Sequence, residues 1–427
     1  MTMGTTVKIG AALAASALVL TACSSGSSEE TAASAAPSSS ASCEADGTLK
    51  LGAILPQTGS LSYLGPPEFA GVDLAIAEVN DAGGVLGEQV EVFRADSGDT
   101  TTSIAVTAAD EQLQRGVDAI IGAASSGVSL TFIDKVTQAG VLQFSPANTG
   151  LVFSDYPDTG LYFRTAPSDL FQGAVLAEVA ASDGITKPAV LALQDAYGEG
   201  LAGSFADNFT AAGGTLALDP VIYDPQAPSF EAEVGQAKAS DPDAVVLIGF
   251  EESKKIVQEL IKQGIGPDKV QLYLVDGNLS QTLGDGLPDG ILEGAKGTQP
   301  GVETSDELRA ALLEIDPELV DFNYAPESYD AVTTIALGAE LAQSDCGADI
   351  AAVLVEVTNN GAECTNFADC KAKIDAGEDF NYNGQSGPIS FDENGDPSEA
   401  TMGVYIYRAD NQYASEDFVS GQVPSGS

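Results

Sequence analysis

The strings DAIIGAASS at residues 118–126 and DAVVLIGFEE at residues 243–252 decide the fold of this 427-residue chain. Each is an apolar run of strand length that ends where the pattern of a new helix begins. Each also follows an amphipathic helix pattern and precedes another apolar run. Strands and helices that alternate in this way predict a mostly parallel sheet with helices on both faces. Because the same order occurs twice, we expect two similar lobes.

The pattern extends outward from both strings. Around the first, it predicts strands at 49–55, 89–97, 117–127 and 141–148 and helices at 66–84 and 102–116. Around the second, it predicts strands at 189–195, 214–224, 242–253 and 270–278, a helix after the first of these and another at 230–240.

The predicted fold class is therefore α/β, with two doubly wound parallel-sheet lobes joined by three hinge crossovers. Ligands bind such sheets beyond the carboxyl ends of the strands, so two lobes that face each other through these edges form a cleft. Crossover candidates lie at 162–169, 294–301 and 386–397. We expect lobe 1 to comprise residues 46–164 and 299–386, lobe 2 residues 165–298 and 387–415, and a flexible tail residues 416–427.

The N-terminus predicts export. Lys8 precedes an uncharged run at 9–23, which has the length of a signal-peptide core and is too short for a permanent membrane span. The run ends in LTAC, which resembles the lipobox of bacterial lipoproteins. The resemblance implies a signal peptide at 1–22 and a lipid on Cys23, followed by a flexible tether at 23–45. We therefore expect an extracytoplasmic protein that is anchored by lipid to the outer face of the cell membrane.

The composition excludes several classes of function. The chain has 63 Asp and Glu against 17 Lys and Arg, no histidine, and a formal net charge of −46. Such a field repels nucleic acid, and because the acids are spread along the chain they indicate a solvated or salt-adapted surface. Without histidine, the usual base for a serine or cysteine nucleophile is missing. We expect neither a nucleic-acid partner nor an enzyme.

A glycine pattern imitates a dinucleotide site. GEGLAG at 198–203 follows an apolar run with the spacing of the NAD fingerprint. In that fingerprint, however, the first glycine forms the turn directly at the strand end. Here four residues intervene, and Asp195 would place negative charge beside any phosphate. We expect no NAD and no other cofactor, and we interpret Gly198 and Gly200 as part of a loop that brings Tyr197 near the cleft.

An acidic string imitates a calcium loop. DENGD at 392–396 has the right beginning, but Pro397 occupies the sixth position, where the loop requires glycine. Asn394 and Gly395 are better interpreted as a tight hairpin turn. We expect no metal site.

The ordered motifs together resemble a known family. They cover nearly the whole globular region and resemble periplasmic-binding-fold type I solute receptors of the leucine/isoleucine/valine branch of ABC importers. The resemblance implies a monomeric receptor that captures an amino acid, most simply a small apolar one, and delivers it to an ABC permease. Amides, urea or aromatic acids as ligands, and a sensor ectodomain as the role, stay open. The motifs, besides the lipobox, are LGAILPQTGSLSYLG, GVDLAIAEVNDAGGVLG, IGAASSGVSL, QFSPANT, YFRTAPSD, DAYGEGLA and FDENGDP.

The resemblance also implies which polar residues hold the ligand. Ser126 would bind the carboxylate at the start of a helix, where free N–H groups and the helix dipole favour an anion. Ala147 would offer its carbonyl to the ammonium group, and Thr149 would offer its hydroxyl to the ammonium and the carboxylate together. Asp276 would pair with the same ammonium, in place of the glutamate that the family more often has. N-capping by serine and turn formation by Asp are the structural alternatives.

Aromatic walls complete the implied site. Tyr197 and Phe250 match positions of the second lobe that close over the ligand. Tyr63 and Tyr329 could add walls from the first lobe, although aromatic residues at such positions also serve as core.

Four cysteines remain once Cys23 is assigned to the lipid. An even number outside the cytoplasm indicates two disulfides, and we favour Cys364 with Cys370, which leaves Cys43 with Cys346. A metal site is the weaker alternative. In the implied fold, both Cys43 and Cys346 lie at the edge of lobe 1 that faces away from the cleft.

Overall fold

The computed structural model describes Cys43 and residues 45–424. The predicted signal peptide, the lipidation site Cys23 and nearly all of the tether lie outside the described residues. Within them, no helix is both long and apolar enough to cross a membrane.

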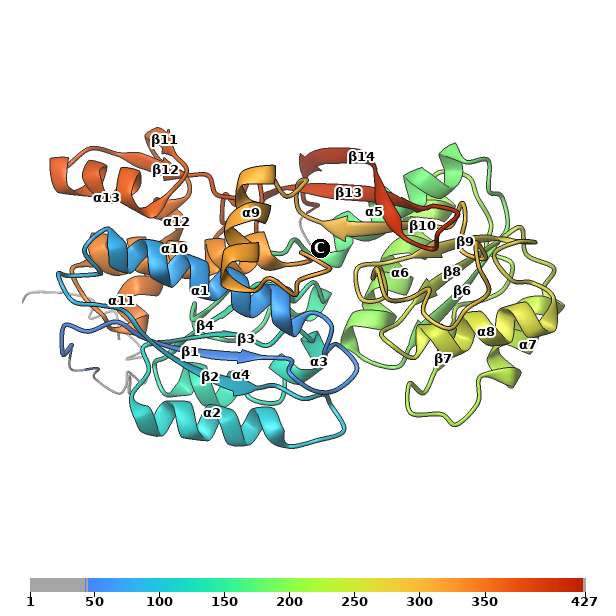
Figure 1. Ribbon diagram of the computed structural model, residues 1–427, viewed down its shortest axis with the longest axis horizontal. Helices are drawn as coiled ribbons and strands as arrows, with labels where there is room; N and C mark the ends of the chain where they lie inside the picture. The colour runs from blue at the N-terminus through green and yellow to red at the C-terminus, as the bar shows by residue number, and fades with distance from the viewer. Residues whose placement is uncertain (1–42, 44, 425–427) are drawn as a thin grey trace, which may run out of the picture. The chain divides into compact units, whose positions relative to one another are not determined.

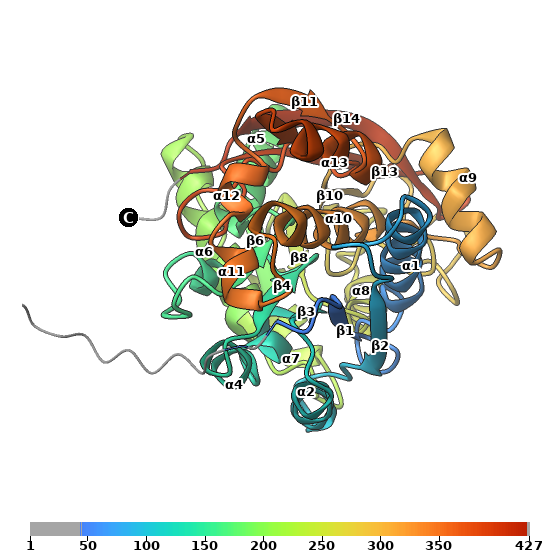
Figure 2. The same ribbon diagram turned by 90° about the vertical axis from the view of Figure 1, so that its left-hand side faces the viewer.

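The first lobe is built on a five-stranded parallel sheet in the order β2-β1-β3-β4-β5 (Figure 1). Figure 2 shows helices α1 and α10 on one side of this sheet and α2 and α4 on the other. Ile54 and Ile120 pack with α2, whereas Leu55 and Ile121 pack with α1 and α10. Burial on both faces explains why β3 is apolar throughout. The bounds are β1 Lys50–Leu55, β2 Glu91–Asp96, β3 Ala119–Gly122, β4 Leu142–Ser145, β5 Tyr162–Arg164, α1 Gly65–Asp81, α2 Ile104–Arg115, α4 Ile133–Gln138 and α10 Ala325–Ala342.

The second lobe is built on a seven-stranded sheet in the order β14-β13-β10-β9-β8-β6-β7. The strands β7, β6, β8, β9 and β10 are parallel, and β13 and β14 extend the sheet in antiparallel fashion. The bounds are β6 Pro188–Leu193, β7 Val221–Tyr223, β8 Ala244–Ile248, β9 Gln271–Leu274, β10 Lys296–Pro300, β13 Glu399–Tyr407, β14 Tyr413–Gln422, α5 Asp169–Ser182, α6 Ala196–Ala211, α7 Glu231–Ala239 and α8 Ser253–Gln263.

Shorter elements complete the chain. The helices α11, α12 and α13 contact α10 in the first lobe. The bounds are α3 Ser126–Ser129, a 3₁₀ turn at Leu151–Phe153, α9 Asp306–Ile315, α11 Gly347–Ala351, α12 Leu354–Val357, β11 Ala362–Cys364, α13 Phe367–Ala376 and β12 Phe380–Tyr382.

The chain passes three times between the two sheets. It leaves β5 for α5, which packs on β10, then leaves β10 for α9, which packs on α1, and finally leaves β12 for β13. These passages span 164–169, 300–306 and 382–399. The predicted class of two parallel-sheet lobes is confirmed. The predicted flexible tail from residue 416 is wrong, because β14 runs to Gln422 and pairs with β13.

Both predicted disulfides are present. Cys364 is bonded to Cys370, and Cys43 to Cys346. The second bond joins the chain just before β1 to the segment after α10, across 303 residues of sequence. All four cysteines are therefore oxidised, and none is available as a thiolate ligand for the alternative metal site.

Candidate functional site

A small cavity lies where the carboxyl ends of the strands of both sheets meet. Its volume of about 10 Å³ is near the minimum that holds one water molecule. Any larger solute therefore requires its walls to move apart. The cavity is lined by Leu61, Leu64, Ala124, Ser125, Ser126, Ala147, Thr149, Tyr197, Phe250, Asp276, Gly277 and Tyr324.

The first lobe contributes the start of α3 to the cavity. Ser125 caps this short helix by accepting a hydrogen bond from the Val128 N–H at 3.4 Å. Ser126 accepts one from the Gly150 N–H at 3.2 Å, which fastens the turn after β4 to the helix start. The first N–H groups of a helix have no partner within it, so this corner presents donors to the cavity.

The turn after β4 brings Ala147 and Thr149 to the cavity. The Ser145 hydroxyl holds the turn, since it donates to Ala123 O at 2.8 Å and accepts from the Asn148 N–H at 2.9 Å. The Thr149 hydroxyl has no hydrogen-bond partner among the described residues, although the side chain is only 1% exposed. A buried hydroxyl without a partner is costly, which makes it a candidate ligand contact.

The second lobe contributes Asp276 and two aromatic rings. Asp276 follows β9, and its carboxylate accepts hydrogen bonds from the Tyr197 hydroxyl at 2.7 Å and the Tyr324 hydroxyl at 2.6 Å. Burial raises the pKa of Asp276, and these two hydroxyls oppose the rise. Tyr197 and Phe250 are stacked, with ring centroids 5.5 Å apart. The second wall therefore joins one acid to an apolar surface.

The tyrosines of the first lobe differ in position. The Tyr63 hydroxyl donates to the backbone carbonyl of Asp276 at 3.1 Å, so Tyr63 bridges the lobes, but it is not among the residues that line the cavity. Tyr329 does not line the cavity. It lies in the second turn of α10, faces α1 and donates to Glu78. The placement of Tyr329 in the site is therefore corrected.

Tyr324, and not Tyr329, is the tyrosine at the start of α10 that lines the cavity. It precedes α10, lines the cavity and adopts the left-handed backbone conformation with φ of 61°. Non-glycine residues in that conformation cluster at functional sites. The available signal was an aromatic residue directly before the helix start at Ala325-Pro326, because that end of the helix faces the cleft.

Asp169 is a second residue that the sequence reasoning missed. It is the first residue of α5, its side chain is fully buried, and both carboxyl oxygens lack a partner among the described residues. Its backbone N–H donates to Thr149 O at 2.8 Å, so it lies directly behind a cavity residue. The sequence signal was an acid at the end of the crossover 162–169.

A buried ion pair holds the passages together. Arg164 forms two parallel hydrogen bonds with Asp396, at 2.6 and 2.7 Å, and both side chains are nearly inaccessible. The same guanidinium donates to Gly150 O at 2.9 Å. The acidic string at 392–396 thus forms a turn, with Gly395 at φ of +80°, whose Asp396 binds the crossover arginine.

The glycine pattern proves to be a packing feature. Gly198 lies in the first turn of α6, so the expectation of a loop there is wrong. The Asp195 carboxylate accepts its N–H at 2.7 Å and occupies the helix start where a phosphate would bind. A Cβ on Gly198 would lie 2.3 Å from Leu193 O, so glycine allows α6 to approach β6.

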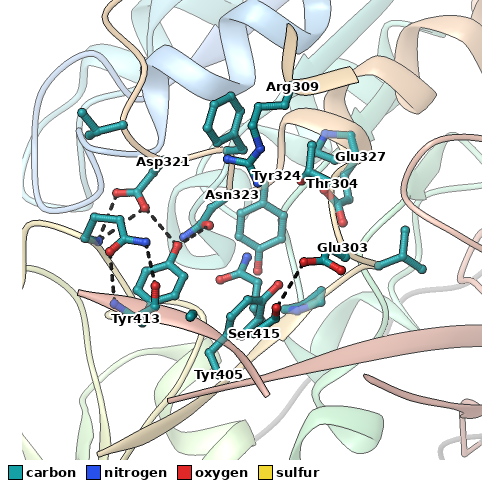
Figure 3. Close-up of a pocket in the computed structure, with 18 residues that line it drawn as sticks. Glu303, Thr304, Arg309, Asp321, Asn323, Tyr324, Glu327, Tyr405, Tyr413 and Ser415 are labelled. Atoms are coloured by element: carbon teal, nitrogen blue, oxygen red, sulfur yellow. Dashed lines mark hydrogen bonds between the residues drawn. The ribbon is translucent and has the colours of Figure 1, made fainter. Parts of the chain in front are cut away.

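A second, larger cavity adjoins the first behind Tyr324. Its volume is about 320 Å³, and Figure 3 shows Arg309, Asp321 and Glu303 around it. Arg309 lies over the Phe322 ring, 4.2 Å from its centroid. Tyr324 lines both cavities and forms part of the wall between them.

Comparison with known proteins agrees with this geometry. The family model described as periplasmic binding protein matches residues 48–414. The chain therefore belongs to the periplasmic binding protein family, a family of solute-binding proteins.

Two relatives and one solved structure show the likeness in detail. The chain is 28% identical to Leu/Ile/Val-binding protein homolog 3 of Brucella melitensis over 69% of this chain and 80% of the relative. It is 28% identical to the chemotactic signal transduction system substrate-binding protein BasB of Halobacterium salinarum, over 79% of this chain and 82% of that protein. The crystal structure of LivJ of Streptococcus pneumoniae, a branched-chain amino acid transporter substrate-binding protein in complex with isoleucine, superposes with a TM-score of 0.70. It is 23% identical and covers 88% of this chain and 99% of its own.

Proposed function

We propose that this protein is the extracytoplasmic substrate-binding lipoprotein of an ABC importer and that it captures an amino acid, most simply a branched-chain one, in the cavity between its lobes. One observation carries the proposal: a single cavity is lined by neutral hydrogen-bonding groups from the first lobe and by a buried acid from the second. A zwitterion presents the complementary pair of charges.

The carboxylate of the ligand would bind to the first lobe, and its ammonium would bind where the two lobes meet. Its carboxylate would accept hydrogen bonds at the start of α3, beside Ser126. Its ammonium would donate to Asp276, to the Thr149 hydroxyl and to the carbonyl of Ala147. The buried Thr149 hydroxyl without a partner supports this assignment.

The side chain of the ligand would lie on apolar surface. Tyr197 and Phe250 form a stacked pair on one side, and Leu61 and Leu64 line the other. Burial of a leucine-sized side chain is worth about 1.5–3 kcal/mol. These walls favour a small apolar amino acid.

Capture would couple to closure of the lobes. Hydrogen bonds from Tyr63 and Tyr324 to Asp276 already cross between the lobes, and the Glu251 N–H donates to Ser60 O at 3.3 Å. A ligand that contacts both walls binds the closed state more tightly and so shifts the population toward it. The closed monomer would then deliver the ligand to the permease, while lipid on Cys23 keeps it at the membrane.

A second candidate role is sensing. The BasB relative is named as part of a chemotactic signal transduction system. The same capture step could feed a transducer in place of a permease. Co-purification of the membrane-anchored protein with its ligand present separates the two roles, because a permease and a transducer are different partners.

Thermal unfolding with a panel of solutes tests the capture step. A ligand that binds only the native state stabilises it by RT ln(1 + [L]/Kd), about 2.7 kcal/mol at 100 times Kd. We expect leucine, isoleucine or valine to raise the midpoint, and urea, acetamide and benzoate to leave it unchanged. Stabilisation by urea or benzoate without any amino acid would refute the ligand assignment.

A further inference from the structure

The second cavity, behind Tyr324, has walls from both lobes. Arg309 of α9 and several of residues 320–327, at the start of α10, come from the first lobe. Gln299 of β10 and Tyr413 of β14 come from the second. The cavity is therefore complete only where the lobes meet. Its volume of about 320 Å³ lies within the usual range of ligand pockets.

One side of the second cavity has its hydrogen bonds satisfied within the protein. The Asp321 carboxylate accepts from the Tyr413 hydroxyl at 2.9 Å and from the Gln281 N–H at 3.2 Å. The Asn323 amide donates to Leu279 O at 2.9 Å. These groups hold the wall together and do not require a solute.

The Gln299 amide is not satisfied in this way. Gln299 lines the second cavity and is 4% exposed, and neither polar atom of its amide has a partner among the described residues. Buried polar groups in native proteins are nearly always paired. An amide both donates and accepts, so it suits a solute that carries an uncharged polar group. The first cavity differs, because Leu61, Leu64 and Phe250 give it apolar walls.

Arg309 is a cation without an anion. It forms no ion pair within the described part of the chain, although the sequence has 63 Asp and Glu. Its guanidinium lies over the Phe322 ring, 4.2 Å from the centroid, and Figure 3 shows it above Tyr324. A guanidinium placed on an aromatic face keeps the N–H groups at its edge for a carboxylate.

The acids of the second cavity exclude a simple anion. Glu303 lines it and accepts a hydrogen bond from the Ser415 hydroxyl at 3.2 Å. Burial raises the pKa of Glu327, another lining residue, to about 8, so this acid is mostly neutral at pH 7. Glu303 and Asp321 repel a lone carboxylate, whereas a zwitterion also brings an ammonium group for Glu303.

We propose that the second cavity binds a second amino acid, one with an uncharged polar side chain such as glutamine, and that this solute strengthens capture in the first cavity. Its carboxylate binds Arg309, its ammonium binds Glu303, and its side-chain amide pairs with Gln299. The binding itself stands apart from the proposed function. The effect on the first cavity rests on the proposed function, since it requires an amino acid there.

Tyr324 connects the two cavities. It lines both, and its hydroxyl donates to Asp276 at 2.6 Å. A solute in the second cavity packs against Tyr324 and contacts both lobes, so it binds the closed arrangement more tightly and shifts the population toward it. Because such coupling is reciprocal, each solute raises the affinity for the other by the same factor, typically about fivefold or more.

Calorimetric titration of leucine with and without saturating glutamine tests the coupling. We expect glutamine to raise the association constant of leucine by about fivefold or more in the wild type and to have no effect in Arg309→Met. The matched control is Arg115→Met, because Arg115 also lies over an aromatic ring, 5.1 Å from the Phe93 centroid, and lines neither cavity. This control should behave as the wild type. Glutamine that weakens leucine binding to the wild type, or leaves it unchanged, would overturn the proposal.

Titration of glutamine alone separates this proposal from the proposed function. If leucine does not bind, the proposed function fails, but glutamine binding still tests the second site. We expect Arg309→Met to weaken it by about tenfold or more and Arg115→Met to leave it unchanged. Gln299→Met keeps the size of the side chain and should remove the preference of the wild type for glutamine over methionine. Equal affinity of the wild type and Arg309→Met for glutamine would overturn the proposal.

Discussion

The two walls of the cavity differ in how their polar groups are satisfied. The first-lobe wall is neutral, and its turn is held from within by Ser145 and by the bond between Ser126 and Gly150. The second-lobe wall centres on Asp276, which takes one of its hydrogen bonds from Tyr324 of the other lobe. The carboxylate end of the site is thus formed in advance, while the ammonium end depends on how the lobes meet.

The largest effect is expected from removing the ion pair between Arg164 and Asp396, which joins two of the passages between the lobes. Arg164→Ala leaves Asp396 buried and uncompensated, which should cost about 3–5 kcal/mol of unfolding free energy. Lys135→Ala breaks an exposed pair with Asp110 and should cost at most about 1 kcal/mol. Urea denaturation of both variants measures the difference. Equal costs would mean that the passages do not depend on this ion pair.

The next largest effect is expected from removing the carboxylate of the second-lobe wall. Asp276→Ala should weaken amino-acid binding by about 2–5 kcal/mol, because the ligand ammonium would be buried without its anion. The circular dichroism spectrum should stay native. Calorimetric titration with leucine measures the loss, and an unchanged dissociation constant would remove Asp276 from the site.

The first lobe also contains a buried acid outside the small cavity. Glu327 in the first turn of α10 is 2% exposed, and burial raises its pKa to about 8. Its folded pKa lies above its unfolded value, so its contribution is full at low pH and is lost as the pH rises from about 4.5 to about 8. The expected slope is about 1.4 kcal/mol per pH unit.

Glu327→Gln isolates that contribution. The variant should match the wild type in stability near pH 4 and exceed it at pH 8, by up to roughly 4 kcal/mol. Thermal unfolding across this pH range is the measurement. A constant difference between the two proteins at every pH would show that Glu327 does not titrate in this way.

The smallest effect is expected from removing the Thr149 hydroxyl of the first-lobe wall. Thr149→Val keeps the shape of the side chain but removes a hydroxyl that lies beside the buried Asp169 carboxyl, so the unliganded fold should lose at most about 1 kcal/mol. Leucine binding should weaken by about 1.5–3 kcal/mol, the worth of a hydrogen bond to a charged group. A variant that loses fold stability instead of affinity would assign Thr149 a structural role.

Much of the fold could be predicted because the sheets are buried on both faces. Continuous apolar runs such as 119–122 and 244–248 identify such strands by composition alone. The strands β5 and β10 were harder. They are short, contain Arg164 and Gln299 and belong to the passages between lobes, so their pattern matches neither a strand nor a helix.

The site was predicted where it follows strand ends and missed where it depends on packing between distant segments. Ser126, Ala147, Thr149 and Asp276 each follow a strand, and all four line the cavity. Tyr324 precedes α10, and Tyr329 lies in its second turn. The packing of α10 against α1 directs Tyr329 to Glu78 and leaves Tyr324 to bind Asp276, and the sequence does not show this packing. The position of Asp169 behind Thr149 depends on how α5 packs against the turn at Thr149, which the sequence does not show.

The most direct test of the account asks whether the site binds both the ammonium and the carboxylate of its ligand. Calorimetric titration compares leucine with 4-methylpentanoate, which lacks the ammonium, and with 3-methylbutylamine, which lacks the carboxylate. The account predicts that leucine binds and that each truncated ligand binds at least about 30-fold more weakly, since each loses a buried charged contact of 2 kcal/mol or more. Binding of either truncated ligand as tightly as leucine would contradict it.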